Sequence, residues 1–179
     1  MYQLMRFFIL ALTCLALAGC TVFPSYRDTD VQLTSMAVLD PARYAGLWYE
    51  VASYDAPFQA GCTNTRAEYT LRDDGTFDVL NTCKRNGALS QIGGAAWIVG
   101  PGRLKVNLDG VPLAADYWVL WVDEGYRTAV VGTPSGRAGW ILNREPEIPA
   151  DRLAAAREVL AFNGYDLGPL VMTTQESAE

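Results

Sequence analysis

The sequence predicts an all-β fold, an eight-stranded antiparallel up-and-down β-barrel with a C-terminal α-helix packed on its wall. Segments with strand character follow one another between residues 47 and 144, and clusters of Gly, Asp, Asn and Pro separate them. Short connections favour antiparallel neighbours, and eight such strands close most simply into a barrel. A change to helical spacing after residue 149 predicts the helix.

Each predicted strand ends at a turn signal such as Asp73-Asp74-Gly75 or Arg85-Asn86-Gly87. The predicted strands are residues 47–55, 63–72, 76–84, 90–99, 103–109, 116–123, 126–133 and 139–144. The helix is predicted over residues 150–163, because apolar residues recur at helical spacing and Gly164 follows as a stop signal. We expect it to cover strand 116–123, which is apolar on both faces.

Alternation of polar and apolar residues indicates which side of the barrel faces inward. In segment 66–72 the residues Ala67, Tyr69 and Leu71 share one parity and polar residues occupy the other, and segments 76–79 and 103–108 follow the same rule. The interior is therefore apolar and the exterior charged, the reverse of an outer-membrane porin. A barrel of this size is either filled by side chains or holds one small ligand.

The amino-acid composition excludes several classes of binding partner and catalytic site. The 179 residues are 50% hydrophobic, which is enough for one domain with its own core, and the formal net charge of -6 disfavours a nucleic-acid partner. The chain contains no histidine, which excludes His-based triads, His acid–base catalysis and most zinc or non-haem iron sites. The sequence thus predicts neither a metal site nor a cofactor.

The first twenty residues predict a location in the cell envelope. Arg6 precedes an apolar stretch over residues 7–17, which is too short to span a membrane and is typical of a signal peptide over residues 1–19. The ending Leu17-Ala18-Gly19-Cys20 resembles the bacterial lipobox. That resemblance implies that Cys20 carries a diacylglyceryl group and an amine acylated by a fatty acid such as palmitate. The alternative is an ordinary secretory leader with a chance Cys.

The resemblance also implies a location. Thr21 stands where an Asp would favour the inner membrane, so the protein is expected on the periplasmic face of the outer membrane. Residues 20–38 are polar and show neither the helical nor the strand repeat of apolar residues, which predicts a lipidated tether. Residues 39–179 are predicted to form the barrel domain. With Cys14 removed in the signal peptide and Cys20 lipidated, Cys62 and Cys83 remain in an oxidising compartment and are expected to form a disulfide. Two buried thiols are the alternative.

Residues 40–52 resemble the opening of a lipocalin, with the signature Gly46-Leu47-Trp48-Tyr49-Glu50 at the start of the first strand. The family also expects an arginine at the end of the last strand, which Arg144 supplies. With the lipobox, the resemblance indicates bacterial outer-membrane lipocalins of the Blc type. It implies a structural signature of Gly46, Trp48 and Arg144, in which the tryptophan closes the narrow end of the barrel and the arginine crosses its ring in a cation–π contact.

Strand parity predicts the wall of a ligand pocket, with Trp48 and Arg144 taken as pointing inward. The pocket residues share this parity and are mostly apolar or aromatic. They are Glu50, Ala52, Tyr54, Tyr69, Phe77, Val79, Leu104, Val106, Tyr117, Trp140 and Leu142. Because a carboxylate in an apolar lumen must be hydrogen-bonded or neutral, Glu50 is the most informative of them.

These observations predict a membrane-anchored protein that binds a fatty acid, lysophospholipid or similar amphiphile for lipid transport or storage in the envelope. The alternative is a filled barrel that acts as an envelope scaffold or interaction module through a homodimer. An enzyme is not expected. The acids Glu50, Asp55, Asp116 and Glu124 have no spacing that pairs two of them, and the cysteines serve better as a bridge than as nucleophiles.

Overall fold

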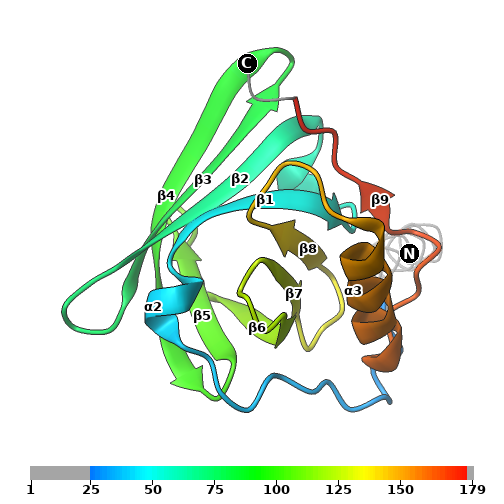
Figure 1. Ribbon diagram of the computed structural model, residues 1–179. Helices are drawn as coiled ribbons and strands as arrows, with labels where there is room; N and C mark the ends of the chain where they lie inside the picture. The colour runs from blue at the N-terminus through cyan, green and yellow to red at the C-terminus, as the bar shows by residue number, and fades with distance from the viewer. Residues whose placement is uncertain (1–24, 177–179) are drawn as a thin grey trace, which may run out of the picture.

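The strand segments fold into a closed antiparallel barrel, as the sequence predicts (Figure 1). The computed structural model describes residues 25–176. Each strand lies within two residues of its predicted bounds. The strands are β1 Gly46–Ser53, β2 Cys62–Leu71, β3 Phe77–Arg85, β4 Ala88–Gly100, β5 Arg103–Leu108, β6 Ala115–Val122, β7 Thr128–Gly132 and β8 Gly139–Asn143. Neighbours in sequence are neighbours in the sheet, and pairing of β1 with both β8 and β2 closes the barrel.

The antiparallel order divides the connections between two ends. The β1–β2, β3–β4, β5–β6 and β7–β8 connections lie at one end, which we call the open end. The β2–β3, β4–β5 and β6–β7 turns lie at the other, the closed end, together with the short helix α2 Pro41–Tyr44. The tightest open-end turn is Asn86-Gly87, where both residues have positive φ, as a two-residue hairpin with the right twist requires.

The helix α3 Ala150–Phe162 packs on the outside of the barrel (Figure 1). Its buried residues Ala156 and Leu160 join an outer cluster with Leu120, Val130 and Ile141, whose side chains point away from the lumen. The helix was expected on strand 116–123. It lies mainly against β7 and touches β6 as well. Because β7 is buried along its whole length, it needs this outer cover even more than β6 does.

A β-bulge in β1 corrects two of the predicted pocket residues. Glu50 pairs with Leu142 on β8, but the next pair is Ala52 with Ile141, so one extra residue lies on β1 between them. A single inserted residue moves every later side chain to the opposite face. Ala52 and Tyr54 therefore lie in the outer cluster and not in the lumen. Tyr54 stacks on Tyr26 with ring centroids 4.9 Å apart.

The segment predicted as a tether is packed on the barrel from residue 25 onward, which corrects its assignment over residues 25–38. Arg27 is buried and donates hydrogen bonds to the carbonyls of Asn163 at 3.1 Å and Pro134 at 2.9 Å. Further along, Leu33 is buried, and the Met36 amide bonds the Val119 carbonyl. Buried carbonyls need such partners, which a polarity pattern does not reveal. The predicted signal peptide over residues 1–19 and the lipidation site Cys20 lie outside the described residues.

The C-terminal segment fills a gap in the barrel wall. β1 and β2 pair only over residues 46–49 and 66–69, and beyond that point the short strand β9 Val171–Met172 pairs with β1. The Thr173 amide then bonds the Val51 carbonyl, and the Asn64 amide bonds the Thr174 carbonyl. The segment thus connects β1 to β2 where the two strands diverge. Among residues 25–176, no helix is long and apolar enough to cross a membrane.

Candidate functional site

The closed end of the barrel is sealed by Trp48, which has no exposed surface. Its indole Nε1 donates to the Tyr44 carbonyl at 2.8 Å, which ties the ring to the last residue of α2. The Arg144 guanidinium lies over the ring, with its Cζ 3.7 Å from the ring centroid. The geometry is that of a close cation–π contact, which is strong where solvent is excluded.

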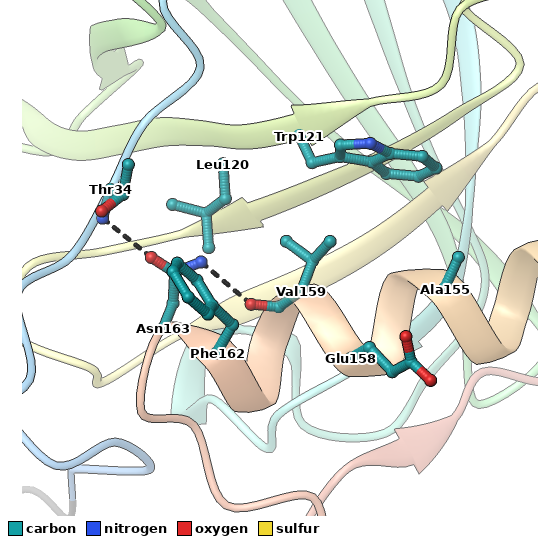
Figure 2. Close-up of a pocket in the computed structure, with 8 residues that line it drawn as sticks. All are labelled: Thr34, Leu120, Trp121, Ala155, Glu158, Val159, Phe162 and Asn163. Atoms are coloured by element: carbon teal, nitrogen blue, oxygen red, sulfur yellow. Dashed lines mark hydrogen bonds between the residues drawn. The ribbon is translucent and has the colours of Figure 1, made fainter.

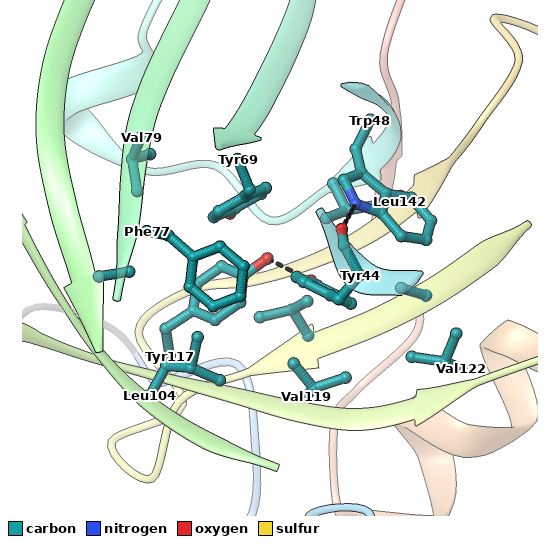
Figure 3. Packing of buried hydrophobic residues seen from close by; sticks show 13 residues of the cluster. Tyr44, Trp48, Tyr69, Phe77, Val79, Leu104, Tyr117, Val119, Val122 and Leu142 are labelled. Carbon is teal, nitrogen blue, oxygen red and sulfur yellow. Dashed lines mark hydrogen bonds between the residues drawn. The ribbon is translucent and has the colours of Figure 1, made fainter. Parts of the chain in front are cut away.

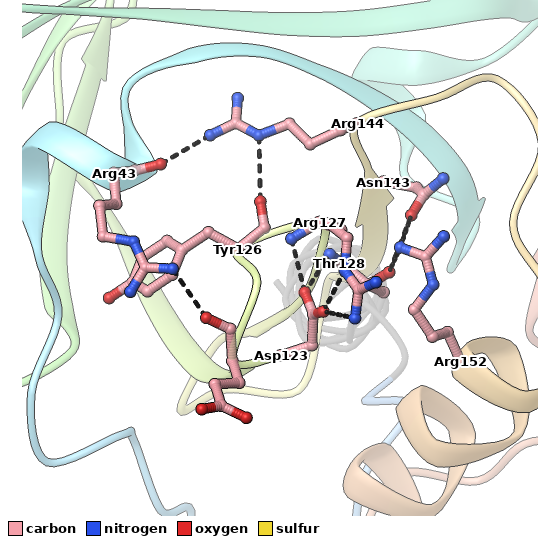
Figure 4. A network of polar contacts seen from close by, with 9 residues as sticks. Arg43, Asp123, Tyr126, Arg127, Thr128, Asn143, Arg144 and Arg152 are labelled. Atoms are coloured by element: carbon pink, nitrogen blue, oxygen red, sulfur yellow. Dashed lines mark hydrogen bonds and ion pairs between the residues drawn. The ribbon is translucent and has the colours of Figure 1, made fainter.

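Arg144 also donates hydrogen bonds to several carbonyls at the closed end. Figure 4 shows its bonds to Arg43 at 2.8 Å and to Tyr126 at 3.2 Å. It donates as well to Leu47 at 2.7 Å and to Ala45 at 2.9 Å. Burial lowers the pKa of its guanidinium from the usual value. One side chain therefore joins the α2 segment, β1 and the β6–β7 turn.

Gly46 makes this approach possible. Its φ of +96° lies in the region that only glycine adopts readily, and a Cβ built there would stand 3.3 Å from Nη1 of Arg144. The structure thus brings Gly46, Trp48 and Arg144 together at the closed end.

Asp123 organises the β6–β7 turn beside Arg144 (Figure 4). Its carboxylate accepts the amides of Arg127 at 2.5 Å and Thr128 at 2.7 Å, and it pairs with the Arg127 guanidinium at 2.7 Å. Burial opposes ionisation, but these bonds together hold the pKa of the carboxyl below its usual value. Thr128 in turn donates to Asn143, and Arg152 of α3 donates to both. The turn is thereby connected to the helix.

Three buried phenols lie above the sealed end (Figure 3). The hydroxyls of Tyr44 and Tyr117 are 2.7 Å apart, and the Tyr69 ring packs 6.1 Å from that of Tyr117. Burial raises the pKa of Tyr69 to about 12 and raises those of Tyr44 and Tyr117 well above their usual value. The phenols therefore stay neutral and offer polar atoms without charge.

A cavity of about 390 Å³ opens above the phenols inside the barrel. Seven of the predicted pocket residues line it, namely Glu50, Tyr69, Val79, Val106, Tyr117, Trp140 and Leu142. Phe77 and Leu104 point inward as predicted but are fully buried in the packed core at the closed end (Figure 3). Their contacts are with other side chains because the barrel narrows there, so they belong to the floor of the lumen and not to its wall.

Sequence reasoning missed several residues of the wall. Ile92 and Ala115 point inward on their strands, and pairing registers extended from Val79 and Val106 would have found them. Leu108, which the alternation in segment 103–108 places on the inward side, also lines the cavity. Phe58, Gln59, Val111 and Leu113 also line the cavity but come from open-end connections. Such connections have no side-chain period, so no sequence signal was available for them.

Glu50 is the one acidic residue of the predicted pocket, and its carboxyl group is hydrogen-bonded. Its oxygens accept from the Gln59 amide and the Thr173 hydroxyl, each at 2.6 Å. Gln59 accepts in turn from the Trp140 indole at 2.9 Å. The network joins the 3₁₀ turn η1 Pro57–Gln59 and the C-terminal segment to the lumen wall. It serves to hold the wall together near the open end.

The disulfide between Cys62 and Cys83 is present and joins β2 to β3. Both cysteines line the cavity at its open end. The nearby guanidinium of Arg85 donates to the Phe58 carbonyl at 2.9 Å, which holds the β1–β2 connection against the hairpin. This side of the opening is therefore fixed by one covalent bond and one charged hydrogen bond.

A second hollow lies outside the barrel, where α3 meets β6 (Figure 2). This groove of about 550 Å³ is lined by Thr34, Leu120, Trp121, Ala155, Glu158, Val159, Phe162 and Asn163. The Asn163 carboxamide bridges its end, accepting from the Thr34 amide and donating to the Val159 carbonyl. A molecule in the groove would contact α3, β6 and the N-terminal segment at Thr34, whereas the lumen surrounds its contents with strands. The lumen is thus the better candidate for an apolar ligand.

A family model described as a lipocalin-like domain matches residues 39–175. Temperature-induced lipocalin-1 of Arabidopsis thaliana is 38% identical over 148 residues, covering 76% of this chain and 80% of that protein. Outer membrane lipoprotein Blc of Vibrio cholerae is 32% identical, covering 96% of this chain and 100% of that protein. The crystal structure of the cockroach allergen Per a 4 has a TM-score of 0.67 at 21% identity, covers 83% of this chain and 97% of that chain, and supports the fold.

The packing at the closed end predicts that Trp48→Ala lowers the free energy of unfolding by about 3 to 5 kcal/mol, because it removes a large buried ring and leaves a cavity. Urea unfolding at pH 7 measures the change. Trp97→Ala is the matched control, since Trp97 lies on β4 and is 36% exposed. The assignment fails if the two variants lose the same stability.

The contacts of Asp123 predict a pH-dependent effect. The folded state lowers the pKa of this carboxyl, so its contribution is present above the unfolded pKa of about 3.9 and is lost as pH falls through the folded pKa. Asp123→Asn should lower the free energy of unfolding by about 1 to 3 kcal/mol at pH 7 and by less in strong acid. Urea unfolding from strong acid to pH 7 measures this effect, and Glu124→Gln at the exposed neighbouring residue is the control. A difference independent of pH would contradict the assignment.

Proposed function

From the premise that this chain belongs to the lipocalin family, we propose that it binds the acyl part of a fatty acid, lysophospholipid or similar amphiphile in its lumen, for transport or storage of lipid in the cell envelope. The cavity of about 390 Å³ is the observation that carries the proposal. Its volume falls within the range of ordinary ligand pockets, about 300 to 1,000 Å³, and exceeds what a filled barrel would leave.

The lining of the lumen supports an amphiphile with its head at the opening. Deep in the barrel the wall consists of Val79, Val106, Leu142 and the phenol rings, which suit an acyl chain. Toward the open end it includes Thr65, whose hydroxyl is buried without a hydrogen-bond partner among residues 25–176. A buried hydroxyl without a hydrogen-bond partner costs free energy, so this position favours a polar ligand group that can hydrogen-bond to Thr65.

Burial of apolar surface supplies the binding energy. At about 25 cal/mol per Å², an acyl chain that buries about 400 Å² contributes about 10 kcal/mol before ordering costs, which is ample for micromolar affinity. The protein as a whole carries a formal charge of -6 and does not attract anionic head groups at long range. The acyl chain therefore dominates affinity.

We propose that the protein acts as a carrier and not as an enzyme. Glu50 and Asp116 are acids that line the cavity, and both already have partners. Glu50 accepts from Gln59 and Thr173, and Asp116 pairs with Lys105 at 2.8 Å. These contacts favour binding over hydrolysis as the role of the lumen.

We further propose that Cys20 carries the lipid anchor and that the protein is held on the periplasmic face of the outer membrane. The lipobox-like ending at Cys20 supports this, as does the similarity to the Vibrio cholerae lipoprotein. The alignment leaves out 4% of 179 residues, about 7, which is fewer than the 19 residues before Cys20 and so includes that position.

Mass spectrometry of the protein purified from its own envelope tests the anchor. The mature chain should begin at Cys20 and carry the mass of a diacylglyceryl group and one further acyl chain, and Cys20→Ala should lack both. Cleavage at another residue without added acyl mass would refute the anchor while leaving the ligand proposal intact.

Filling the lumen tests the ligand proposal. Val106→Trp places an indole in the cavity and should abolish the ligand-bound species seen by native mass spectrometry with palmitate or lysophosphatidylethanolamine, with circular dichroism unchanged. Asn107→Trp is the matched control, because the next residue on β5 points outward and is exposed. Equal binding by both variants, or none by the parent protein across these lipids, would contradict the proposal.

A further inference from the structure

We propose that the open end of the barrel is a membrane-contacting surface, seated on the phospholipid bilayer that holds the anchor. The inference extends the proposed function, because it rests on acylation of Cys20. Its subject is a surface formed by Phe58, Leu89, Val111 and Leu113, which we call the rim. All four residues lie in or beside open-end connections, and so they share one end of the barrel.

The start of the described chain lies at this same end. The Tyr26 amide donates to the Gly136 carbonyl at 2.8 Å, and Gly136 belongs to the β7–β8 connection. The Tyr26 hydroxyl donates to the Asp55 carbonyl at 2.7 Å, in the β1–β2 connection. Arg27 holds the segment there through Pro134. The chain therefore leaves the fold toward its N-terminus from between two open-end connections.

The short length of chain between Cys20 and Ser25 limits how the barrel can be oriented on the membrane. Five peptide units separate Cys20 from Ser25, and a fully extended chain spans about 17 Å over that length. Strands of 8 to 10 residues, such as β1 and β2, tilted by about 40°, make the barrel roughly 20 to 25 Å deep. A lipid on Cys20 can thus reach the bilayer with the open end seated on it, but the tether is too short for the closed end to face the membrane.

The rim has the surface that a bilayer requires. Phe58 is 60% exposed, Leu89 73% and Leu113 78%, and they come from three different connections around the opening. Phe58, Val111 and Leu113 also line the cavity, so apolar surface is continuous from the rim into the lumen. Large apolar side chains clustered in this way mark interaction surfaces.

Charge does not oppose the contact. The open-end connections contain Asp55, Asp109 and Arg137, and Arg85 flanks the β3–β4 turn. Two carboxylates and two guanidiniums sum to zero, whereas the whole chain carries -6. An anionic membrane surface repels net negative charge, and the neutral open end meets no such repulsion. A ligand could then pass between bilayer and lumen without crossing water.

Depth-dependent quenching tests the orientation in the acylated protein, reconstituted in vesicles of phosphatidylethanolamine and phosphatidylglycerol. Leu113→Trp adds an indole at the rim. Val38→Trp adds one near the closed end, where Val38 is 75% exposed and Asp40 contacts Tyr126. Phospholipids brominated on their acyl chains should quench the added emission of Leu113→Trp and leave that of Val38→Trp unchanged. Quenching of Val38→Trp, or of neither variant, would overturn the proposal.

A second measurement separates this surface from the ligand site. Leu89→Ser changes the rim residue that does not line the cavity, and this variant should take up a fluorescent fatty acid from the vesicles several-fold more slowly than the parent, with the amount bound at equilibrium unchanged. The control variant Val99→Ser alters an exposed apolar residue of the same sheet at the closed end.

Equal slowing of both variants, or dimers that bury the rim on the vesicles, would overturn the proposal. A parent protein that takes up no fatty acid would refute the proposed function, and the quenching result would still decide the orientation.

Discussion

The contact between Arg144 and Trp48 is the interaction on which the barrel depends. A closed barrel must still fill or cap its ends, and here one guanidinium covers the sealing ring while donating to carbonyls of the α2 segment, β1 and the β6–β7 turn. The partners of Arg144 lie up to 101 residues from it in the sequence. With one end closed so firmly, the strands can diverge at the other without loss of the fold, and that divergence leaves room for a cavity.

Strand parity was enough to predict the barrel and seven residues of the lumen wall, because inward side chains repeat every second residue and the barrel keeps its registers over long pairings such as β3 with β4. It was wrong at Ala52 and Tyr54, where the bulge in β1 adds one residue that no polarity pattern marks. It also could not distinguish the cavity wall from the floor at Phe77 and Leu104, since that depends on how the barrel tapers.

The N-terminal segment shows a different limit. Residues 25–38 are polar in sequence, yet Arg27 and Leu33 are buried, because the barrel supplies carbonyls and an apolar surface that only the folded state brings together. Membership of the lipocalin family was readable from Gly46, Trp48 and Arg144. The place where the chain leaves the barrel was not readable, and that place determines which end of the molecule a short lipid tether brings to the membrane.

The C-terminal segment has a consequence for how the lumen keeps its contents. Where β1 and β2 diverge, beyond the pairing of residues 46–49 with 66–69, the wall is completed by residues 173–175, with Gln175 donating to the carbonyls of both Glu50 and Thr65. A few separate hydrogen bonds hold this seam, whereas neighbouring strands such as β3 and β4 share a continuous ladder. Release of residues 173–175 would therefore open a side window into the cavity while the rest of the barrel stays closed.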